Sequence, residues 1–177
     1  MTRAVALQLG GRSVTDRSVD TRAAWRDLFT ATYPTMAGWV RRLVDDDDTA
    51  HEIASEAFTR LMSHWSLPDD PHAYLYKIAI NLVRDHWRRT KRERAALSSI
   101  ASRQRDERAA SPDSGMNLRD LLEPLPQHQR IAVVLHYLAG MPIRDVALTV
   151  GRPEGTVKSD LYQARERLRA EWDASHD

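Results

Sequence analysis

Apolar residues recur at helical spacing along most of the chain, and turn-forming residues separate the periodic segments. Glycine and proline lie mostly between these segments, and no stretch alternates apolar and polar residues convincingly, as a half-buried strand does. We therefore predict an all-α protein with two small helical domains joined by a flexible linker. The predicted parts are a disordered N-terminal lead over 1–20, a first lobe over 21–94, a linker over 95–117 and a second lobe over 118–173.

The first lobe contains the longest periodic segments. Pro34 is expected to start a new helical segment, because proline has no backbone N–H to donate inside a helix. The acidic run 45–48 should cap a helix over 50–62, since carboxylates favour the positive end of the helix dipole. A long helix then follows over 71–94. The residues expected in this core are Trp25, Leu28, Phe29, Met36, Val40, Leu43, Val44, Ile53, Ala54, Ala57, Phe58, Leu61, Trp65, Leu75, Ile78, Ala79, Leu82 and Val83.

The second lobe ends in the most informative stretch of the sequence, 142–172. The segment before the lobe loses its periodicity, and its serine, proline, glycine and charged residues predict the flexible linker. Two helices interrupted by the sequence PLP come next, and then a short helix, a tight turn at Gly151 and a longer helix. This order predicts a helix-turn-helix. The apolar residues expected inside the lobe are Leu121, Leu122, Leu125, Ile131, Val134, Leu135, Leu138, Val146, Val150, Val157 and Leu161.

The longer helix of this motif predicts contact with double-stranded DNA. Side chains that can reach base edges in the major groove share one of its surfaces, namely Lys158, Ser159, Tyr162 and Gln163. Nearby side chains that could hold phosphates are Arg144, Arg152, Thr156, Arg165 and Arg167. Acidic residues count against a uniformly basic footprint, namely Glu154, Asp160 and Glu166. An ordinary corner between two helices with a solvated charged face is the alternative.

The helix over 71–94 interleaves aromatic and basic residues. Aromatic rings can stack on unpaired bases while basic side chains follow the phosphates, a combination used for single-stranded nucleic acid. Five cations occupy the seven positions from Arg88 to Arg94, and such a cluster repels itself unless a polyanion neutralises it. For Tyr74 or Trp87 alone, covering a small core is the more common role. The interleaved residues are Tyr74, Tyr76, Lys77, Asn81, Arg84, His86, Trp87, Arg88 and Arg89.

The helix over 50–62 carries a pair of acidic residues. Glu52 and Glu56 share one face at i,i+4 spacing, and no base lies between them. Such a face is usually only solvated, but it could also bind a basic partner.

Composition excludes several classes of function. The net charge is only +1, so nucleic-acid affinity has to come from local patches. The chain has no cysteine, which excludes disulfides and thiol catalysis and fits a reducing cytoplasm. No apolar run approaches the length of a membrane span, so we expect no membrane contact. The seven histidines form no HxxxH or HExxH pattern and no GxxxxGK[ST] loop is present, so we expect no metal, no cofactor, no catalytic residues and no enzyme activity.

Two sequence blocks, in this order, resemble the extracytoplasmic-function (ECF, group 4) sigma factors of the sigma-70 family, the promoter-recognition subunits of bacterial RNA polymerase. The blocks TAHEIASEAFTRLMSHW and DDPHAYLYKIAINLVRDHWRR together resemble region 2 of that family. The block LLEPLPQHQRIAVVLHYLAGMPIRDVALTVGRPEGTVKSDLYQARERL resembles region 4. The resemblance implies a sigma factor that binds core polymerase and directs promoter-specific initiation of transcription.

The resemblance also implies a role for each matched position. It implies that region 4 reads the −35 element as duplex DNA through Arg152, Thr156, Lys158, Ser159, Tyr162, Gln163, Arg165 and Arg167. It implies that region 2 melts and captures the −10 element, with a flipped-out base in the loop 66–71, through Asp69, Asp70, His72, Tyr74, Lys77, Asn81, Arg84, Arg88 and Arg89. The implied protein partners are the polymerase β flap, an anti-sigma factor, and the β′ coiled coil, which would meet Glu52, Ile53, Glu56 and Phe58 as contacts or their supports.

Some positions depart from the family pattern. Thr49 stands where an acidic residue is usual and Ser55 where glutamine is usual, which alters the expected β′ contact. Asp160 and Gln163 replace commonly basic residues, so the −35 preference does not follow from the family. Two alternatives stay open. One is a LuxR-type helix-turn-helix regulator, whose N-terminal domain needs strands, and the other is a helical adaptor that binds polymerase without DNA. No sensory domain is expected after Trp172.

Overall fold

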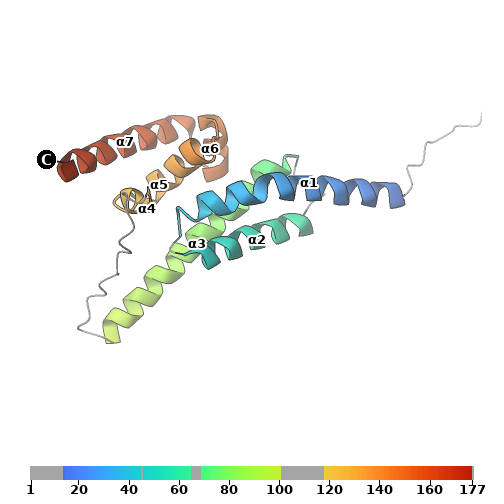
Figure 1. Ribbon diagram of the computed structural model, residues 1–177, viewed down its shortest axis with the longest axis horizontal. Helices are drawn as coiled ribbons and strands as arrows, with labels where there is room; N and C mark the ends of the chain where they lie inside the picture. The colour runs from blue at the N-terminus through green and yellow to red at the C-terminus, as the bar shows by residue number, and fades with distance from the viewer. Residues whose placement is uncertain (1–13, 45, 65–68, 101–117, 177) are drawn as a thin grey trace, which may run out of the picture.

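The structure, a computed structural model, describes residues 14–44, 46–64, 69–100 and 118–176, and all regular structure in these ranges is helical (Figure 1). The first lobe consists of α1 (Val14–Val40), α2 (Asp47–Ser63) and α3 (Pro71–Ile100). The second consists of α4 (Leu118–Leu122), α5 (Gln127–Val133), the π-helical turn η1 (Val134–Leu138), α6 (Ile143–Val150) and α7 (Glu154–His176). The predicted all-α fold with two helical lobes is confirmed, while residues 1–13 and the linker residues 101–117 lie outside the described ranges.

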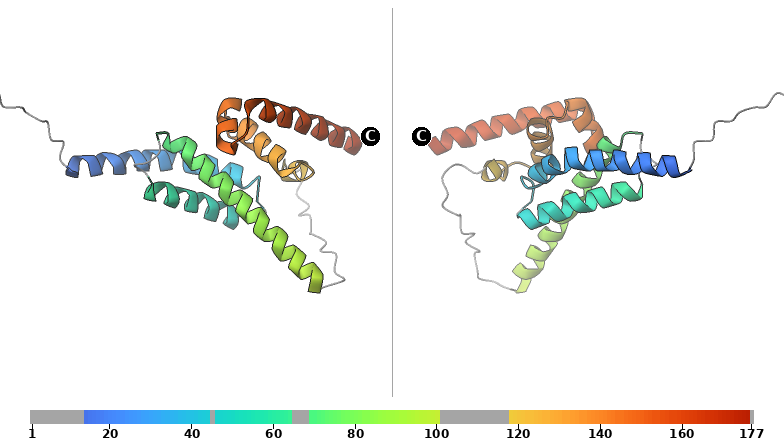
Figure 2. Two further views of the ribbon diagram at one scale, coloured as in Figure 1. Left: turned by 180° about the vertical axis from the view of Figure 1, so that it is seen from behind. Right: turned by 45° about the vertical axis from the view of Figure 1, so that its right-hand side comes forward.

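In the first lobe, α1 and α2 run antiparallel side by side and α3 crosses both (Figures 1 and 2). Burial of a large apolar side chain favours folding by about 1.5–3 kcal/mol, so the shared core holds the three helices together. Most predicted core positions are buried, and Trp65 lies outside the described residues. The predicted core positions that are only partly covered are Trp25, Leu28, Phe29, Ile78 and Leu82. The fully buried side chains include Met36, Val40, Phe58, Leu61, Leu75, Ile80 and Val83.

The bounds of two helices in the first lobe differ from the prediction. Helix α1 begins at Val14, so residues 14–20 of the predicted disordered lead are helical. It also continues through Pro34, because Phe29 before it and Met36 after it pack in the same core, and this burial outweighs one lost backbone hydrogen bond. Helix α3 extends to Ile100, past the predicted end at 94, through the good helix-forming residues 95–97.

The corner between α1 and α2 is held by Asp46, which confirms the predicted acidic cap. The Asp46 carboxylate accepts hydrogen bonds from the backbone N–H of Thr49 at 2.7 Å and from the Thr49 hydroxyl at 2.7 Å. Both bonds favour the charged carboxylate and lower the pKa of Asp46. Asp47, in the first turn of α2, forms an ion pair with Arg41 of the preceding turn. The start of α2 is therefore fixed by local polar contacts.

In the second lobe, α5 and α7 pack against each other and η1 continues α5. The backbone N–H of Ala139 donates to the Val134 carbonyl at 3.0 Å, five residues back, which widens the turn. Leu138, predicted in the core, is 40% exposed, because the extra residue in a π turn rotates the following side chains around the helix axis. The buried residues between α5, η1 and α7 include Ile131, Leu135, Leu161 and Ala164.

The predicted helix-turn-helix is confirmed in α6 and α7. Gly151 ends α6 with φ +70°, a left-handed conformation that glycine adopts without strain. The N–H groups of Gly151 and Arg152 both donate to the Ala147 carbonyl, at 2.9 and 3.0 Å. Val146 and Val157 are fully buried across the turn, so the two helices are locked at this corner.

Candidate nucleic-acid interface

The outer face of α7 brings together the side chains predicted to read duplex DNA. Pro153 precedes the helix, and its carbonyl accepts from the N–H of Thr156 at 3.0 Å and of Val157 at 3.1 Å. The inner face is apolar, so the residues between the buried positions point to solvent. Four predicted base-reading side chains are exposed together on this face, namely Lys158, Ser159, Tyr162 and Gln163. Their role in reading bases remains a prediction.

The side-chain amide of Gln163 already forms hydrogen bonds within the second lobe. Its Oε1 accepts from Nε2 of the buried Gln129 at 2.9 Å, and its Nε2 donates to the Ser159 hydroxyl at 3.5 Å. Bidentate pairing of glutamine with adenine uses both the amide oxygen and the amide nitrogen. The bond from Gln129 therefore occupies one of the two acceptor sites of the Gln163 oxygen and fixes the direction of its amide.

Asp160 lies inside the lobe and does not face the DNA side, contrary to the sequence interpretation. Its side chain is 9% exposed and forms an ion pair with Arg152, and His128 Nε2 lies 3.5 Å from its other oxygen. Asp160 follows Val157 and precedes Ala164 at helical spacing on the buried stripe, a signal that the sequence contains. Arg152, predicted to hold a phosphate, is thus half-buried and already paired with Asp160.

The other residues predicted around the −35 contact are mostly accessible. Thr156 is half-buried in the first turn of α7. Exposed arginines that could follow the DNA backbone are Arg144, Arg165 and Arg167.

One stripe of α3 carries the basic and polar residues predicted for the −10 contact. Lys77, Asn81, Arg84 and Arg88 follow each other at steps of four, three and four residues, which places them on one face of the helix. Arg88 forms an ion pair with Asp85, and Arg89 Nε lies 3.8 Å from Glu93. Asp85 and Glu93 therefore reduce the mutual repulsion that the sequence predicted for the basic residues of 88–94. Both pairs are exposed and contribute only about 0–1 kcal/mol each, so phosphates could replace the carboxylates.

Two aromatic residues of α3 face the core, which agrees with the more common role given above for Trp87 and leaves the Tyr76 ring unavailable to stack on bases. Tyr76 is buried and stacks on Trp39 with ring centroids 5.5 Å apart. Trp87 is half-buried and donates its Nε1–H to the Leu43 carbonyl at 2.8 Å. Both lie on the same helical stripe as the buried Val83, so spacing assigns them to the core. Tyr74 is partly buried against the same core.

The N-terminus of α3 is organised by a second acidic cap. Asp70 accepts from the backbone N–H of Ala73 at 3.0 Å. The ring of the exposed His72 lies 4.8 Å from the Tyr76 ring, and Asp69 is exposed. Residues 65–68, which include most of the loop expected to capture a base, lie outside the described ranges.

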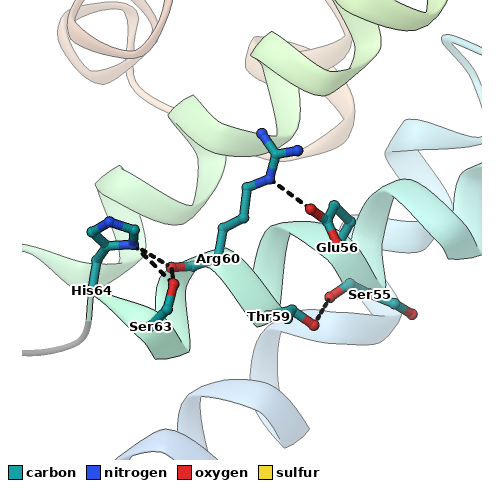
Figure 3. A network of polar contacts seen from close by, with 6 residues as sticks. All are labelled: Ser55, Glu56, Thr59, Arg60, Ser63 and His64. Atoms are coloured by element: carbon teal, nitrogen blue, oxygen red, sulfur yellow. Dashed lines mark hydrogen bonds and ion pairs between the residues drawn. The ribbon is translucent and has the colours of Figure 1, made fainter.

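Helix α2 presents the acidic pair on its surface. Glu52 and Glu56 are exposed, whereas Ile53 and Phe58 are buried and act as supports. Glu56 accepts from Arg60 Nε at 2.7 Å (Figure 3), so the expectation of an acidic face without a relieving base is wrong at this position. Figure 3 also shows the end of α2, where the Ser63 hydroxyl donates to the Arg60 carbonyl at 2.8 Å.

The two residues of α2 that depart from the family pattern bind within the lobe. Thr49 completes the Asp46 cap, and the Ser55 hydroxyl lies 3.3 Å from the hydroxyl of Tyr33 on α1. The Tyr33 hydroxyl also lies 3.0 Å from His51 Nδ1. The sequence interpretation missed Tyr33, because its hydroxyl reaches these partners only after α1 and α2 pack.

The second lobe covers part of the basic stripe. Arg84 Nη2 lies 3.4 Å from the Val150 carbonyl at the end of α6, and the Arg130 guanidinium lies 5.6 Å from the centre of the Trp87 ring. Burial lowers the pKa of Arg84, and the like charges of Arg88 and Arg152 lower it further. Arg84 therefore links the stripe to the helix-turn-helix.

The described ranges contain no helix long and apolar enough to cross a bilayer. They also contain no group of three or more histidine, cysteine, aspartate or glutamate side chains that could hold a metal ion.

Each of the two lobes matches a known protein family. Residues 28–93 match the family described as Sigma-70 region 2, and residues 115–168 match Sigma-70, region 4. The RNA polymerase sigma-E factor of Streptomyces coelicolor is 32% identical over 134 residues, which cover 74% of this chain and 76% of that protein. The ECF RNA polymerase sigma factor SigD of Mycobacterium tuberculosis is 30% identical over 137 residues, covering 74% and 65%.

The fold is similar to that of solved sigma factors. The sigma factor RpoE from Bartonella quintana, solved in complex with the anti-sigma factor NepR, gives a TM-score of 0.67 at 20% identity, covering 83% of this chain and 95% of that one. The two helical lobes, the helix-turn-helix and the matches to both regions together show that the protein is a sigma factor. The chain belongs to the ECF group of the sigma-70 family, whose members direct promoter-specific initiation of transcription. The LuxR-type alternative is not favoured, because the first lobe matches region 2 and has no strand in its described residues.

Proposed function

We propose that the two lobes divide promoter recognition between duplex and melted DNA. The observation that carries this proposal is the presence, in one chain, of a basic stripe on the region 2 helix α3 and an exposed polar face on the region 4 helix α7. The second lobe binds the −35 element and sets the register. The first lobe holds a single strand of the −10 element with a flipped base, which offsets the few kcal/mol that unstacking costs.

Tethering the two contacts adds specificity. Once one lobe is bound, the second contact becomes intramolecular, with an effective concentration set by the length of the linker. The spacing between the two promoter elements then becomes part of what is recognised. The residues we assign to the −10 element are Asp69, Asp70, His72, Tyr74, Lys77, Asn81, Arg84, Arg88 and Arg89, with Asp70 as a helix cap and Tyr74 as partial core support.

The acidic face of α2 is the proposed dock for core polymerase. Glu52 and Glu56 are exposed over the buried Ile53 and Phe58, so a basic partner surface such as the β′ coiled coil would meet fixed carboxylates. Arg60 has to release Glu56 for that contact. Region 4 would meet the β flap in the same assembly.

Further aspects of the proposal follow from the family. The protein acts as a recognition subunit in the cytoplasm, and the polymerase performs the catalysis. An anti-sigma factor is a further proposed partner, because two proteins of similar fold were solved in complexes, one with the anti-sigma factor NepR and one with the cytosolic domain of CnrY.

Reconstituted transcription tests this function. The full chain is mixed with core polymerase, the complex is isolated by gel filtration, and run-off transcription from a library of genomic fragments is mapped at transcript starts. We expect starts that share one pair of upstream elements at fixed spacing. Binding to core without initiation on any template would support the helical adaptor, and DNA binding without core would support a separate regulator.

A further inference from the structure

A series of side-chain hydrogen bonds runs from the inside of the second lobe to the outer face of α7. It begins at Gln129 on α5, which is only 1% exposed. Gln129 Nε2 donates to Gln163 Oε1 at 2.9 Å, and Gln163 Nε2 donates to the Ser159 hydroxyl at 3.5 Å. Gln163 and Ser159 are both exposed. A buried residue of α5 is therefore connected to two of the side chains that we assign to the −35 element.

The hydrogen bonds of this series all run in one direction, from the interior to the surface. An amide oxygen accepts and an amide nitrogen donates, so the bond from Gln129 turns the Gln163 oxygen toward the lobe and leaves its nitrogen on the outer side. Ser159 accepts from that nitrogen, and its own hydroxyl hydrogen remains to donate. Hydrogen bonds aligned in this way polarise and strengthen one another. The exposed end of the series thus presents two donors, the second N–H of Gln163 and the O–H of Ser159.

The burial of Gln129 works against the stability of the lobe. Its Oε1 atom is buried and has no hydrogen-bond partner among the described residues. A buried polar atom without a partner destabilises a fold, and each such atom in a natural protein needs a specific explanation. An apolar side chain of similar volume would fill the same space without this cost. The glutamine is therefore better explained by the donor that it supplies to Gln163.

The neighbouring residue of α5 holds the same part of α7. His128 Nε2 lies 3.5 Å from a carboxylate oxygen of Asp160, and the other oxygen of Asp160 pairs with Arg152. Adjacent residues of α5 thus contact two positions of α7 that lie about one helical turn apart. These contacts fix α7 against α5, so the Gln163 amide meets its buried partner in a constant place.

The base edge that matches two neighbouring donors is that of guanine. In the major groove guanine presents two acceptors, O6 and N7, whereas cytosine presents an amino donor. Adenine presents one acceptor beside an amino donor, and glutamine pairs with it bidentately only when the amide oxygen also faces the groove. The bond from Gln129 directs that oxygen toward the lobe. Guanine is therefore the base that this arrangement favours.

We propose that Gln129 is a positioning residue for −35 recognition: by holding the Gln163 oxygen, it makes Gln163 and Ser159 select guanine over adenine. Gln129 is buried and acts only through Gln163. The proposal rests on the proposed function, because it requires that the outer face of α7 meets the −35 element. It adds the base that these side chains select and the buried residue that sets their orientation.

Transcription by core polymerase with the full chain, on a library randomised over the −35 element, tests the proposal. Gln163→Ala identifies the base position that Gln163 contacts, where the native chain should prefer guanine to adenine. Gln129→Met keeps a similar volume and removes the donor, so it should lower that preference by about threefold, the size of one neutral hydrogen bond. In a Gln163→Ala background Gln129→Met should have no further effect on the preference. Gln127→Met, on the exposed side of α5, is the matched control and should leave the preference unchanged.

Thermal unfolding separates a positioning role from support of the fold. Because Gln129→Met also removes an unsatisfied buried oxygen, the melting temperature should be unchanged or higher. A lower melting temperature with an unchanged base preference would make Gln129 a structural residue and overturn the proposal. A native preference for adenine at the Gln163 position would overturn it too, as would an effect of Gln129→Met that persists in the Gln163→Ala background.

Lys158→Ala distinguishes a failure of this proposal from a failure of the proposed function. If Lys158→Ala changes the −35 profile while Gln129→Met does not, α7 reads the −35 element without Gln129, and only the role of Gln129 is wrong. If neither Lys158→Ala nor Gln163→Ala changes the profile, α7 does not read the element, and both proposals fail.

Discussion

Asp46 shows how a single side chain can fix a corner of this fold. Asp46→Ala removes both hydrogen bonds to Thr49 and is expected to lower the free energy of unfolding by about 1 kcal/mol, the usual value of a helix N-cap. Urea unfolding followed by circular dichroism measures this loss. Asp48→Ala is the control, because it removes a first-turn carboxylate that favours the helix dipole by only about 0.3–1 kcal/mol. A larger loss for Asp48→Ala than for Asp46→Ala would contradict this assignment.

The same residue predicts a dependence of stability on pH. The folded pKa of Asp46 lies below its ordinary value of 3.8, so its contribution is complete above that pH and is lost as the pH falls through the folded value. The difference in unfolding free energy between the native chain and Asp46→Ala should therefore be constant near neutrality and shrink in acid. Urea titrations at neutral pH and below pH 3.8 measure it.

Lys158 and Gln163 differ in how free they are to read DNA. Lys158 is exposed, whereas the Gln163 amide oxygen accepts from Gln129 at 2.9 Å. We expect Lys158→Ala to change the preference at one −35 position by about 1–3 kcal/mol, the usual value of a good base contact, and Gln163→Ala to change it less. Transcription from a randomised promoter library measures both. Arg169→Ala, on the same helix outside the assigned contacts, is the control, and an unchanged profile for Lys158→Ala would refute its role.

The helix-turn-helix contains two glycines for which the same substitution should act in opposite directions. Gly151 has φ +70° with open space around it, so Gly151→Ala introduces only backbone strain and should destabilise by about 1–2 kcal/mol. Gly155 lies in the first turn of α7, also in open space, and Gly155→Ala should stabilise by up to about 0.5–1 kcal/mol. Thermal unfolding of the two variants measures the difference. A change in stability of the same sign in both variants would mean that the turn is not formed as described.

Substitutions in the middle of α3 should reduce promoter melting more than they reduce polymerase binding. Arg88 and Arg89 are exposed and held only by weak pairs with Asp85 and Glu93, so they are available to phosphates. The double variant R88A/R89A should reduce open-complex formation by roughly tenfold or more, since two charge-assisted contacts are lost. Permanganate footprinting measures melting, and co-elution with core measures binding. R22A/R26A on α1 is the control, and equal loss of melting and core binding in R88A/R89A would refute this role.

Elements with a strong apolar period could be predicted from the sequence, and those governed by packing could not. Helices α2, α6 and α7, the Asp46 cap and the Gly151 turn follow local rules of spacing and capping. The passage of α1 through Pro34 and the π turn η1 depend on tertiary contacts that outweigh local preference. In the site, helical spacing correctly placed Lys158 and its neighbours on an outer face. The same spacing places Tyr76 and Asp160 on buried stripes, where the sequence interpretation did not put them.

The contact between the lobes should respond to salt. At this contact Arg84 of the first lobe meets the like charge of Arg152 of the second lobe, and salt screens such repulsion, with a Debye length of about 30 Å at 0.01 M and about 8 Å at 0.15 M. We expect the radius of gyration of the free protein to fall as salt rises over this range. Small-angle scattering measures it. Arg84→Gln removes one of the repelling charges and should reduce the response, whereas Arg26→Gln should not, and an identical response in both variants would contradict this account.

The contact of Arg84 with the Val150 carbonyl also bears on how the protein is distributed in a cell. A chromosome offers millions of phosphate sites that compete for any basic surface irrespective of sequence. With one arginine of the α3 stripe covered by the helix-turn-helix, and with a net charge of only +1, the unassembled chain presents less to those sites than it would with the stripe fully open. Fewer copies would then be lost on the genome, and more would remain free to meet the transcription machinery.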